Sequence, residues 1–471
     1  MTCSPPAAPG PPEPPEDAAV TTETVTEPVS TPRERRGWYF YDWAASAYNT
    51  TVTTVFLGPY LTSIAEKAAG CAEEGQTCAD LHPLGIPVAP GSFFAYALSL
   101  SVFAQVLVLP IVGAYADRSW HKKRLLAWLT AFGAGTTLAM LFVTGDRYLL
   151  GGALLVVSNI LFGAAETVYY SYLPQISDPD ERDAVSSRGW AIGYLGGGLL
   201  LLFNVIAVLA GDSLGWSTAE IARWSIVSAG AWWAVFAVYA IRPLRDRPPV
   251  ETSRSRSVFY AFNQLGRTLR ELGSLRLTLF FLIAYLVYND GIQTVITLSA
   301  TYATEELKLE QTALVPTILM IQFLAFGGAL LLGAVARRIG AWKAVLASLV
   351  LWAVVLVAAY FVPARAPLQF VALGAAIGLV LGGSQALSRS LFSQLIPAGK
   401  EAEYYGIYQI SDRGTSWLGP LLFGLAYQLT DSYRISIVSL IVFFVVGFFL
   451  LLAVPMRRAI LAAGNEPPRL L

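Results

Sequence analysis

Twelve apolar runs, each long enough to cross a lipid bilayer, recur along the 471 residues of this chain. The apolar core of a bilayer is crossed by about 20 helical residues, and only helices or closed barrels satisfy every backbone hydrogen bond there. Because the sequence lacks the alternating pattern of barrel strands, we expect an all-α membrane protein with twelve transmembrane helices. The runs cover residues 37–61, 92–116, 124–144, 148–173, 185–210, 221–241, 277–303, 311–335, 341–362, 367–395, 403–428 and 433–455.

The composition supports a membrane protein and argues against several other classes. Hydrophobic residues make up 55% of the chain and charged residues 14%, which is more apolar surface than a soluble fold can cover. The 32 basic and 32 acidic residues cancel, so we expect no nucleic-acid partner. Two histidines and three cysteines are too few for a His/Cys metal site and weaken the case for a hydrolase. We therefore expect no metal, no cofactor and no enzymatic activity.

The distribution of Lys and Arg predicts how the chain is oriented in the membrane. If the N-terminus is cytoplasmic, the cytoplasmic segments hold 23 of the 32 basic residues and the opposite side holds six. The other three lie inside predicted helices. This bias predicts that both termini are cytoplasmic.

A basic segment divides the predicted helices into two sets of six. Residues 242–276 form this cytoplasmic linker, with one set in residues 37–241 and the other in residues 277–456. Residues 1–36 are rich in proline and poor in apolar side chains, so we expect a disordered cytoplasmic tail. Residues 457–471 form a second cytoplasmic tail.

Several features of the first set of helices repeat in the second. The charged hinge Gly113–Arg124 lies between two apolar runs, and a weaker echo of it, Gly333–Lys343, lies between two others. Within the helices, Glu166 matches Gln385 at corresponding places. Duplicated halves with a binding site at their interface are a known transporter architecture. We therefore expect two pseudo-symmetric six-helix bundles.

Polar and ionisable side chains inside membrane helices are costly, so each is a functional candidate. Asp290 lies about halfway along its predicted helix, at the depth where a proton or a solute would bind. The alternative for Asp290 is a structural hydrogen bond, and for the uncharged residues it is packing between helices. Glu166 lies in the cytoplasmic portion of its helix, so its alternative is an ion pair between helices at the inner mouth. The candidates for proton coupling or substrate binding are Asp290, Glu166, Asn289, Asn49, Tyr48 and Gln385.

A second group of charged residues lies in the cytoplasmic portions of the predicted helices. At that depth we expect ion pairs between helices that close the inner mouth, rather than contacts with a solute. The members of this group are Asp42, Arg188, Arg389, Asp412 and Arg413.

Two other features predict only structural roles. The aromatic residues within 38–43 are typical of a belt at the cytoplasmic membrane surface. Cys71 and Cys78 lie in the longest predicted outer loop, where an oxidising exterior would favour a disulfide. The sequence leaves open whether this disulfide forms.

The hinge Gly113–Arg124, read G-A-Y-A-D-R-S-W-H-K-K-R, resembles the signature loop between helices 2 and 3 of the major facilitator superfamily, although Trp120 replaces the usual glycine. The resemblance implies a cytoplasmic latch, in which the loop contacts helix 11. Its residues here are Gly113, Asp117, Arg118 and Arg124.

Four longer stretches resemble the vacuole-effluxer branch of that superfamily, the relatives of autophagy-related amino-acid exporters. They are Y-F-Y-D-W-A-A-S-A-Y-N-T-T-V (39–52), L-P-Q-I (173–176), S-R-G-W-A-I-G-Y-L-G-G-G (187–198) and E-Y-Y-G-I-Y-Q-I-S-D-R-G-T-S-W-L-G-P-L-L-F-G (403–424).

This resemblance implies export of amino acids across a membrane. Together with the ionisable residues inside the helices, it leads us to expect a secondary transporter that moves a small organic solute, an amino acid, by proton-linked alternating access. We expect a monomer in a bacterial plasma membrane, with the solute, protons and the lipid bilayer as its partners. Two alternatives remain: an exporter of drugs or sugars with the same fold, and a membrane sensor or scaffold that does not transport.

Overall fold

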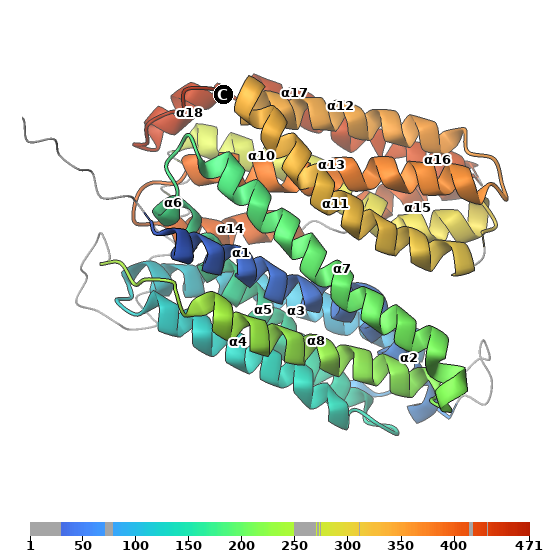
Figure 1. The fold of residues 1–471 in the computed structure, drawn as a ribbon. Helices are drawn as coiled ribbons and strands as arrows, with labels where there is room; N and C mark the ends of the chain where they lie inside the picture. Colours follow the sequence, from blue (N-terminus) through green and yellow to red (C-terminus); the bar gives the residue numbers. More distant parts are fainter. Residues whose placement is uncertain are drawn as a thin grey trace, which may run out of the picture.

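The computed structural model describes residues 30–70, 79–248, 270, 273, 275–309, 311–413, 418–430 and 432–471, and these are nearly all helical (Figure 1). Within them the only β-type pairing is a single bridge between Leu81 and Val88. The chain folds as an all-α protein because the long apolar runs satisfy their backbone hydrogen bonds locally.

The first group of helices, together with the segments that connect them, is called the N-terminal half here (residues 30–248). Its helix α1 continues through π-helical turns, Tyr48–Phe56, into α2. The helices are α1 (Pro32–Ala47), α2 (Leu57–Ala68), α3 (Phe93–Arg118), α4 (Lys122–Ala139), α5 (Tyr148–Tyr170), α6 (Leu173–Ile176), α7 (Arg182–Leu214) and α8 (Thr218–Ile241).

The second group is called the C-terminal half (residues 270–471). Figure 1 shows it stacked on the N-terminal half, with α7 and α11 running along the boundary between them. The helices are α10 (Arg276–Thr301), α11 (Gln311–Ile339), α12 (Ala341–Tyr360), α13 (Pro367–Gln394), α14 (Glu401–Arg413), α15 (Leu418–Thr430), α16 (Tyr433–Ser439), α17 (Ile441–Ala453) and α18 (Met456–Ala462).

Ten spans of the described residues are long and apolar enough to cross a membrane. They correspond to ten of the twelve predicted runs. The other two runs are also helical: 37–61 forms α1, the π-helical turns and part of α2, and 403–428 forms parts of α14 and α15. The count of twelve crossings and the side on which the termini lie stay predictions.

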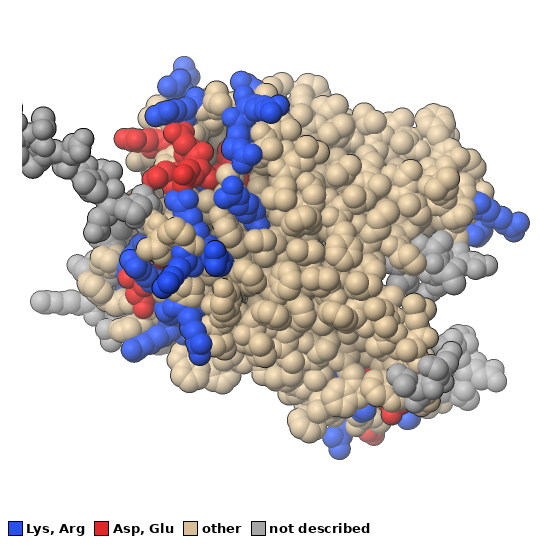
Figure 2. Space-filling view, in the orientation of Figure 1, with Lys and Arg blue, Asp and Glu red and all other residues tan. Residues whose placement is uncertain are grey.

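Charged side chains gather at one end of the molecule, and a broad band free of them covers the middle of the face seen in Figure 2. We call this the charged end, and its described residues include four of the ion pairs. Large apolar side chains such as Phe103 and Leu209 are exposed elsewhere on the surface, 66% and 80% respectively, as a lipid environment requires. The pairs are Arg35–Glu181, Lys122–Asp117, Arg247–Glu34 and Arg469–Asp180.

The first helix begins earlier than the sequence predicts. Thr31 caps α1 by accepting a hydrogen bond from the Glu34 backbone N–H at 3.3 Å, and Pro32 occupies the first turn. Glu34 is fully buried and pairs with Arg247 at 2.8 Å. The predicted disordered tail therefore ends too late, because residues 30–36 belong to the folded chain.

The C-terminal tail is also part of the fold. Asn465 Nδ2 donates hydrogen bonds to the carbonyls of Gln394 and Ile396, at 2.8 and 2.7 Å. The backbone N–H of Arg469 donates to Asp180 of the N-terminal half at 2.8 Å. Cys71 and Cys78 lie outside the described residues.

Candidate functional site

The last turn of α3 contacts the beginning of α14 across the boundary between the halves. Asp117 accepts hydrogen bonds from the backbone N–H groups of Ala402 and Glu403, both at 2.9 Å. A carboxylate in this position caps the first turn of α14 and is stabilised by the helix dipole. Lys122 Nζ lies 3.2 Å from the same carboxylate, whose side chain is only 5% exposed.

Two glycines allow α3 and α14 to approach this closely. A Cβ on Gly113 would lie 2.2 Å from the carbonyl oxygen of Ala402, and a Cβ on Gly406 would lie 2.8 Å from that of Leu109. Neither glycine can therefore carry a side chain unless the helices separate. The crossing fixes where Asp117 meets the beginning of α14.

Glu401 opens α14 beside this contact. Its carboxylate accepts a hydrogen bond from the Gly399 backbone N–H at 3.0 Å. Burial raises the pKa of the Glu401 carboxyl, and the nearby Asp117 carboxylate raises it further, whereas Lys122 acts in the opposite direction. The ionised form of Glu401 is therefore disfavoured where α14 packs on α3.

A fully buried arginine of the C-terminal half inserts into the N-terminal half. Arg389 on α13 is 0% exposed, and its Nη1 lies 3.3 Å from Asp42 Oδ2 on α1. Its Nε donates to Ser186 Oγ and its Nη2 to the Ser186 carbonyl, each at 3.0 Å. A buried charge needs such a set of partners to offset its lost hydration.

Three aromatic rings of the N-terminal half surround the same guanidinium group. Its central carbon lies 4.9 Å from the ring centroid of Trp38, 4.8 Å from that of Tyr170 and 5.4 Å from that of Trp190. Cation–π attraction adds to the ion pair at these distances. The prediction that the aromatic residues within 38–43 form only a surface belt is wrong for Trp38 and Tyr41, which are both 0% exposed.

The beginning of α7 adds a second inter-half cluster that the sequence analysis missed. Ser390 Oγ donates to Asp183 Oδ1 at 2.5 Å, and Arg182 Nη1 donates to the Ser393 carbonyl at 3.3 Å. Ser186 Oγ donates to the Ala386 carbonyl at 2.7 Å. The predicted helix began at residue 185, so Arg182 and Asp183 were assigned to a loop. Two charged residues at the edge of an apolar run were the available signal.

Three further polar contacts join the halves. Gln409 Nε2 donates to Glu166 Oε2 at 3.3 Å. Tyr194 OH donates to Gln385 Oε1 at 2.7 Å, which brings α7 onto α13. Gln322 Nε2 donates to Thr50 Oγ1 at 3.4 Å. Two of the predicted site residues, Glu166 and Gln385, therefore lie at the boundary between the halves.

Asp290 lies near the middle of α10 and is 2% exposed. Within the described chain, neither of its carboxylate oxygens accepts a hydrogen bond of ordinary length and angle, although the backbone N–H of Gly419 on α15 lies beside the carboxylate. One turn later, Thr294 Oγ1 donates to the backbone carbonyl of Asp290 at 2.7 Å. Gly419 of α15 lies against this turn, and a Cβ there would be 1.7 Å from Thr294 Oγ1. The carboxylate is thus enclosed at mid-helix.

Some predicted substrate or coupling residues lie elsewhere. Tyr48 is 0% exposed, bonds to Ser158 at 2.9 Å and stacks on Phe162, so it packs inside the N-terminal half instead of facing a cavity. Asn49 is exposed and accepts a hydrogen bond from Thr53 at 3.0 Å. Asn289 is buried beside Asp290 on α10.

The predicted latch and gate residues also differ in their positions. Arg188 and Arg124 are exposed, and the structure shows neither in an ion pair among the described residues. Arg118 is partly buried and donates to the Ala114 carbonyl of its own helix at 3.3 Å. Asp412 and Arg413 end α14, and their side chains lie outside what the structure describes.

The arrangement of the helices defines a class of protein. It matches the solved structure of FucP, a major facilitator superfamily transporter in the outward conformation, with a TM-score of 0.64 at 14% identity over 90% of this chain and 98% of that one. The proton:xylose symporter XylE gives a TM-score of 0.66 at 12% identity over 89% of this chain and 94% of that one. These likenesses establish the fold of a major facilitator transporter.

The chain belongs to the family described as "Vacuole effluxer Atg22 like", whose model matches residues 30–464. The "Uncharacterized MFS-type transporter YxiO" of Bacillus subtilis is 28% identical over 425 residues, covering 90% of this chain and 95% of that protein. "Autophagy-related protein 22" of Pyricularia oryzae is 26% identical over 506 residues, covering 87% and 74%. The predicted family is confirmed. The chain is a multi-pass membrane transporter of small solutes and not an enzyme.

Proposed function

We propose that this transporter exports amino acids by proton-linked alternating access. The observation that carries the proposal is the Asp290 carboxylate, which is buried at mid-helix without an ordinary hydrogen bond in the described chain. An ionised carboxylate at such a depth is costly unless a cation or a proton neutralises it. A proton, or the ammonium group of an amino acid, would supply that neutralisation.

The inter-half contacts support alternating access. The Asp117 contact with α14, the Arg389–Asp42 pair and the Ser390–Asp183 hydrogen bond all join the two halves. A solute can pass this end only if these contacts break. We propose that they form the closed inner gate, and that residues 37–241 and 277–456 move as the two bundles.

The remaining assignments follow from the family and from the chain's own residues. Glu166 and Gln385 each hydrogen-bond across the boundary, so they are the second candidates for contact with solute or proton. The family description names an effluxer, which supports export. The Bacillus subtilis relative supports a bacterial plasma membrane as the location.

The test is transport by the purified full-length chain in liposomes. Labelled amino acids are offered as a panel, with and without an imposed pH gradient, to the wild type and to Asp290→Asn. We expect the gradient to drive accumulation of at least one amino acid, and we expect Asp290→Asn to abolish the effect of the gradient.

Asp146→Asn is the matched control, because Asp146 is an exposed carboxylate in the turn between α4 and α5. It should transport like the wild type. Uptake that is the same with and without the gradient, and the same in Asp290→Asn as in the wild type, would refute proton coupling. If labelled sugars or drug-like cations are transported and no amino acid is, the substrate assignment is wrong while the transporter assignment stands.

A further inference from the structure

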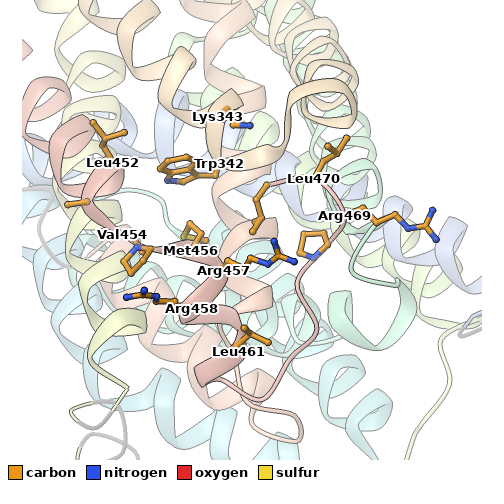
Figure 3. Close-up of a pocket in the computed structure, with 14 residues that line it drawn as sticks. Trp342, Lys343, Leu452, Val454, Met456, Arg457, Arg458, Leu461, Arg469 and Leu470 are labelled. Carbon is orange, nitrogen blue, oxygen red and sulfur yellow. The ribbon is translucent and has the colours of Figure 1, made fainter.

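A pocket of about 720 Å³ lies at the charged end of the C-terminal half, beside the C-terminal tail. It is framed by the first turn of α12, the end of α17, α18 and the C-terminal tail (Figure 3). Trp342 is fixed on one side of it by a hydrogen bond from its indole Nε1 to the Leu451 carbonyl at 3.0 Å. The transport contacts described above involve none of these elements.

The charged side chains of this pocket are all positive, and the terminal carboxylate of Leu471 also lies in its lining. Lys343, Arg457 and Arg458 line it, all three are exposed, and no Asp or Glu is among its lining residues. Across the described chain, none of the three takes part in an ion pair. A fourth lining cation, Arg469, lies 3.5 Å from Asp180 and turns outward in Figure 3. Three unpaired cationic side chains therefore share the lining with one terminal carboxylate, which leaves the pocket with a net positive charge.

The rest of the lining is apolar. Leu452, Leu461 and Leu470 are 45%, 58% and 51% exposed, and Trp342 and Met456 complete the surface. Leu452 belongs to α17, a helix of the span 433–453 that is apolar enough to cross a membrane. The pocket thus lies where the apolar band meets the charged end. A ligand that fits it has an anionic head and an apolar body.

We propose that this pocket is a binding site for an anionic phospholipid. The phosphate of the headgroup lies among Lys343, Arg457 and Arg458, and the acyl chains run along Leu452 and Leu461. Basic residues beside membrane helices attract anionic headgroups, and their alkyl stems tolerate the apolar surroundings. A soluble anion would use the cations and leave the exposed leucines without a partner.

The site is tested on the purified full-length chain in detergent. Thermal unfolding is followed with added phosphatidylglycerol, phosphatidylcholine or inorganic phosphate, and retained lipid is counted by native mass spectrometry. We expect phosphatidylglycerol to raise the Tm and to be retained. The double variant Arg457→Gln/Arg458→Gln should bind it about 30-fold more weakly, from the usual attraction of two basic residues to an anionic surface.

Arg33→Gln/Arg36→Gln is the matched control, because these two arginines are exposed on α1 at the charged end of the other half. It should bind like the wild type. Lys343→Gln gives a second, single-charge test if the double variant folds poorly in phosphatidylcholine. Equal binding by the wild type, the double variant and Lys343→Gln would overturn the proposal. An equal Tm rise with inorganic phosphate would also overturn it, because the ligand would then be a soluble anion.

Discussion

Arg389 carries a positive charge into a position where water does not reach it, because its side chain is completely buried between the halves. Its countercharge, Asp42, lies 347 residues earlier in the sequence. The sequence could predict that both residues lie at the inner mouth, since each is a charge inside an apolar run. It could not predict that they pair, because nothing local links them.

At this residue we predict a large loss of stability when the cation is removed. Arg389→Gln leaves the buried Asp42 without its partner and should cost about 3–5 kcal/mol in the free energy of unfolding. Thermal unfolding of the purified protein measures this.

The double variant Asp42→Asn/Arg389→Gln separates charge from packing. If the ion pair dominates, the double variant should lose less free energy of unfolding than the sum of the losses in the two single variants. Strict additivity would contradict the prediction.

The raised pKa of Glu401 leads us to predict that the stability of the proposed closed gate depends on pH. Because burial and the Asp117 carboxylate raise the pKa of Glu401, its ionised form opposes the packing of α14 on α3. The contact therefore loses stability as pH rises through this raised pKa, and it gains stability as pH falls. We expect Glu401→Gln to be more stable than the wild type at neutral pH, with the difference vanishing in acid.

The measurement is the Tm of both proteins from about pH 4, near the ordinary pKa of a glutamate, up to about pH 8. Glu466→Gln, at an exposed carboxylate of the C-terminal tail, is the control and should follow the wild type. A wild-type curve parallel to that of Glu401→Gln would show that Glu401 does not cause the dependence.

Among the helices, α12 was predicted well and α1 was not. The predicted run 341–362 became Ala341–Tyr360, because Gly340 with a φ of 93° ends the preceding helix sharply. The beginning of α1 is polar, and its helical state depends on the Thr31 cap and on the pairing of Glu34 with Arg247. A hydropathy pattern contains no information about either contact, so it could not predict where α1 begins.

For the crossing of α3 and α14 we predict that Gly113→Ala forces the helices apart. The added methyl group would meet backbone atoms of Ala402 and Glu403, so the strain should cost at least about 1–3 kcal/mol and should weaken the Asp117 contact. The decrease in Tm measures the strain, and the decrease in transport measures the weakened Asp117 contact.

The matched control is Gly135→Ala on α4, where a Cβ meets nothing within 4 Å. This variant should be neutral or stabilising by up to about 1 kcal/mol, because alanine favours a helix. A similar loss in both variants would mean that the close crossing at Gly113 does not explain the effect.

For the whole molecule, the proposed alternating access requires the halves to separate where α7 meets α13 during each transport cycle. We predict that a disulfide between Asp183→Cys and Ser390→Cys, whose wild-type side chains hydrogen-bond at 2.5 Å, stops transport when an oxidant is added. A reductant should restore it. Transport in liposomes measures both steps, with Cys3, Cys71 and Cys78 changed to serine beforehand.

The controls are the two single-cysteine variants, which should not respond to oxidant. Full transport by the cross-linked double variant would contradict a gate at this end.

At this scale, the sequence predicts the all-helical fold and the transporter family, because run lengths and motif residues are local information. The way the halves meet depends on contacts between distant residues. The resemblance assigned Asp117 to the cytoplasmic latch. Asp183 and Ser390 belong to no motif that we recognised in the sequence.

The crossing of α3 and α14 also limits how this chain can vary over evolutionary time. The groups that crowd Gly113 and Gly406 are carbonyl oxygens and other backbone atoms of the facing helix. A side chain that is too large can usually be tolerated when its neighbour becomes smaller, but every residue carries the same backbone. No second-site substitution can make room at these positions, so any descendant that keeps this crossing should retain both glycines.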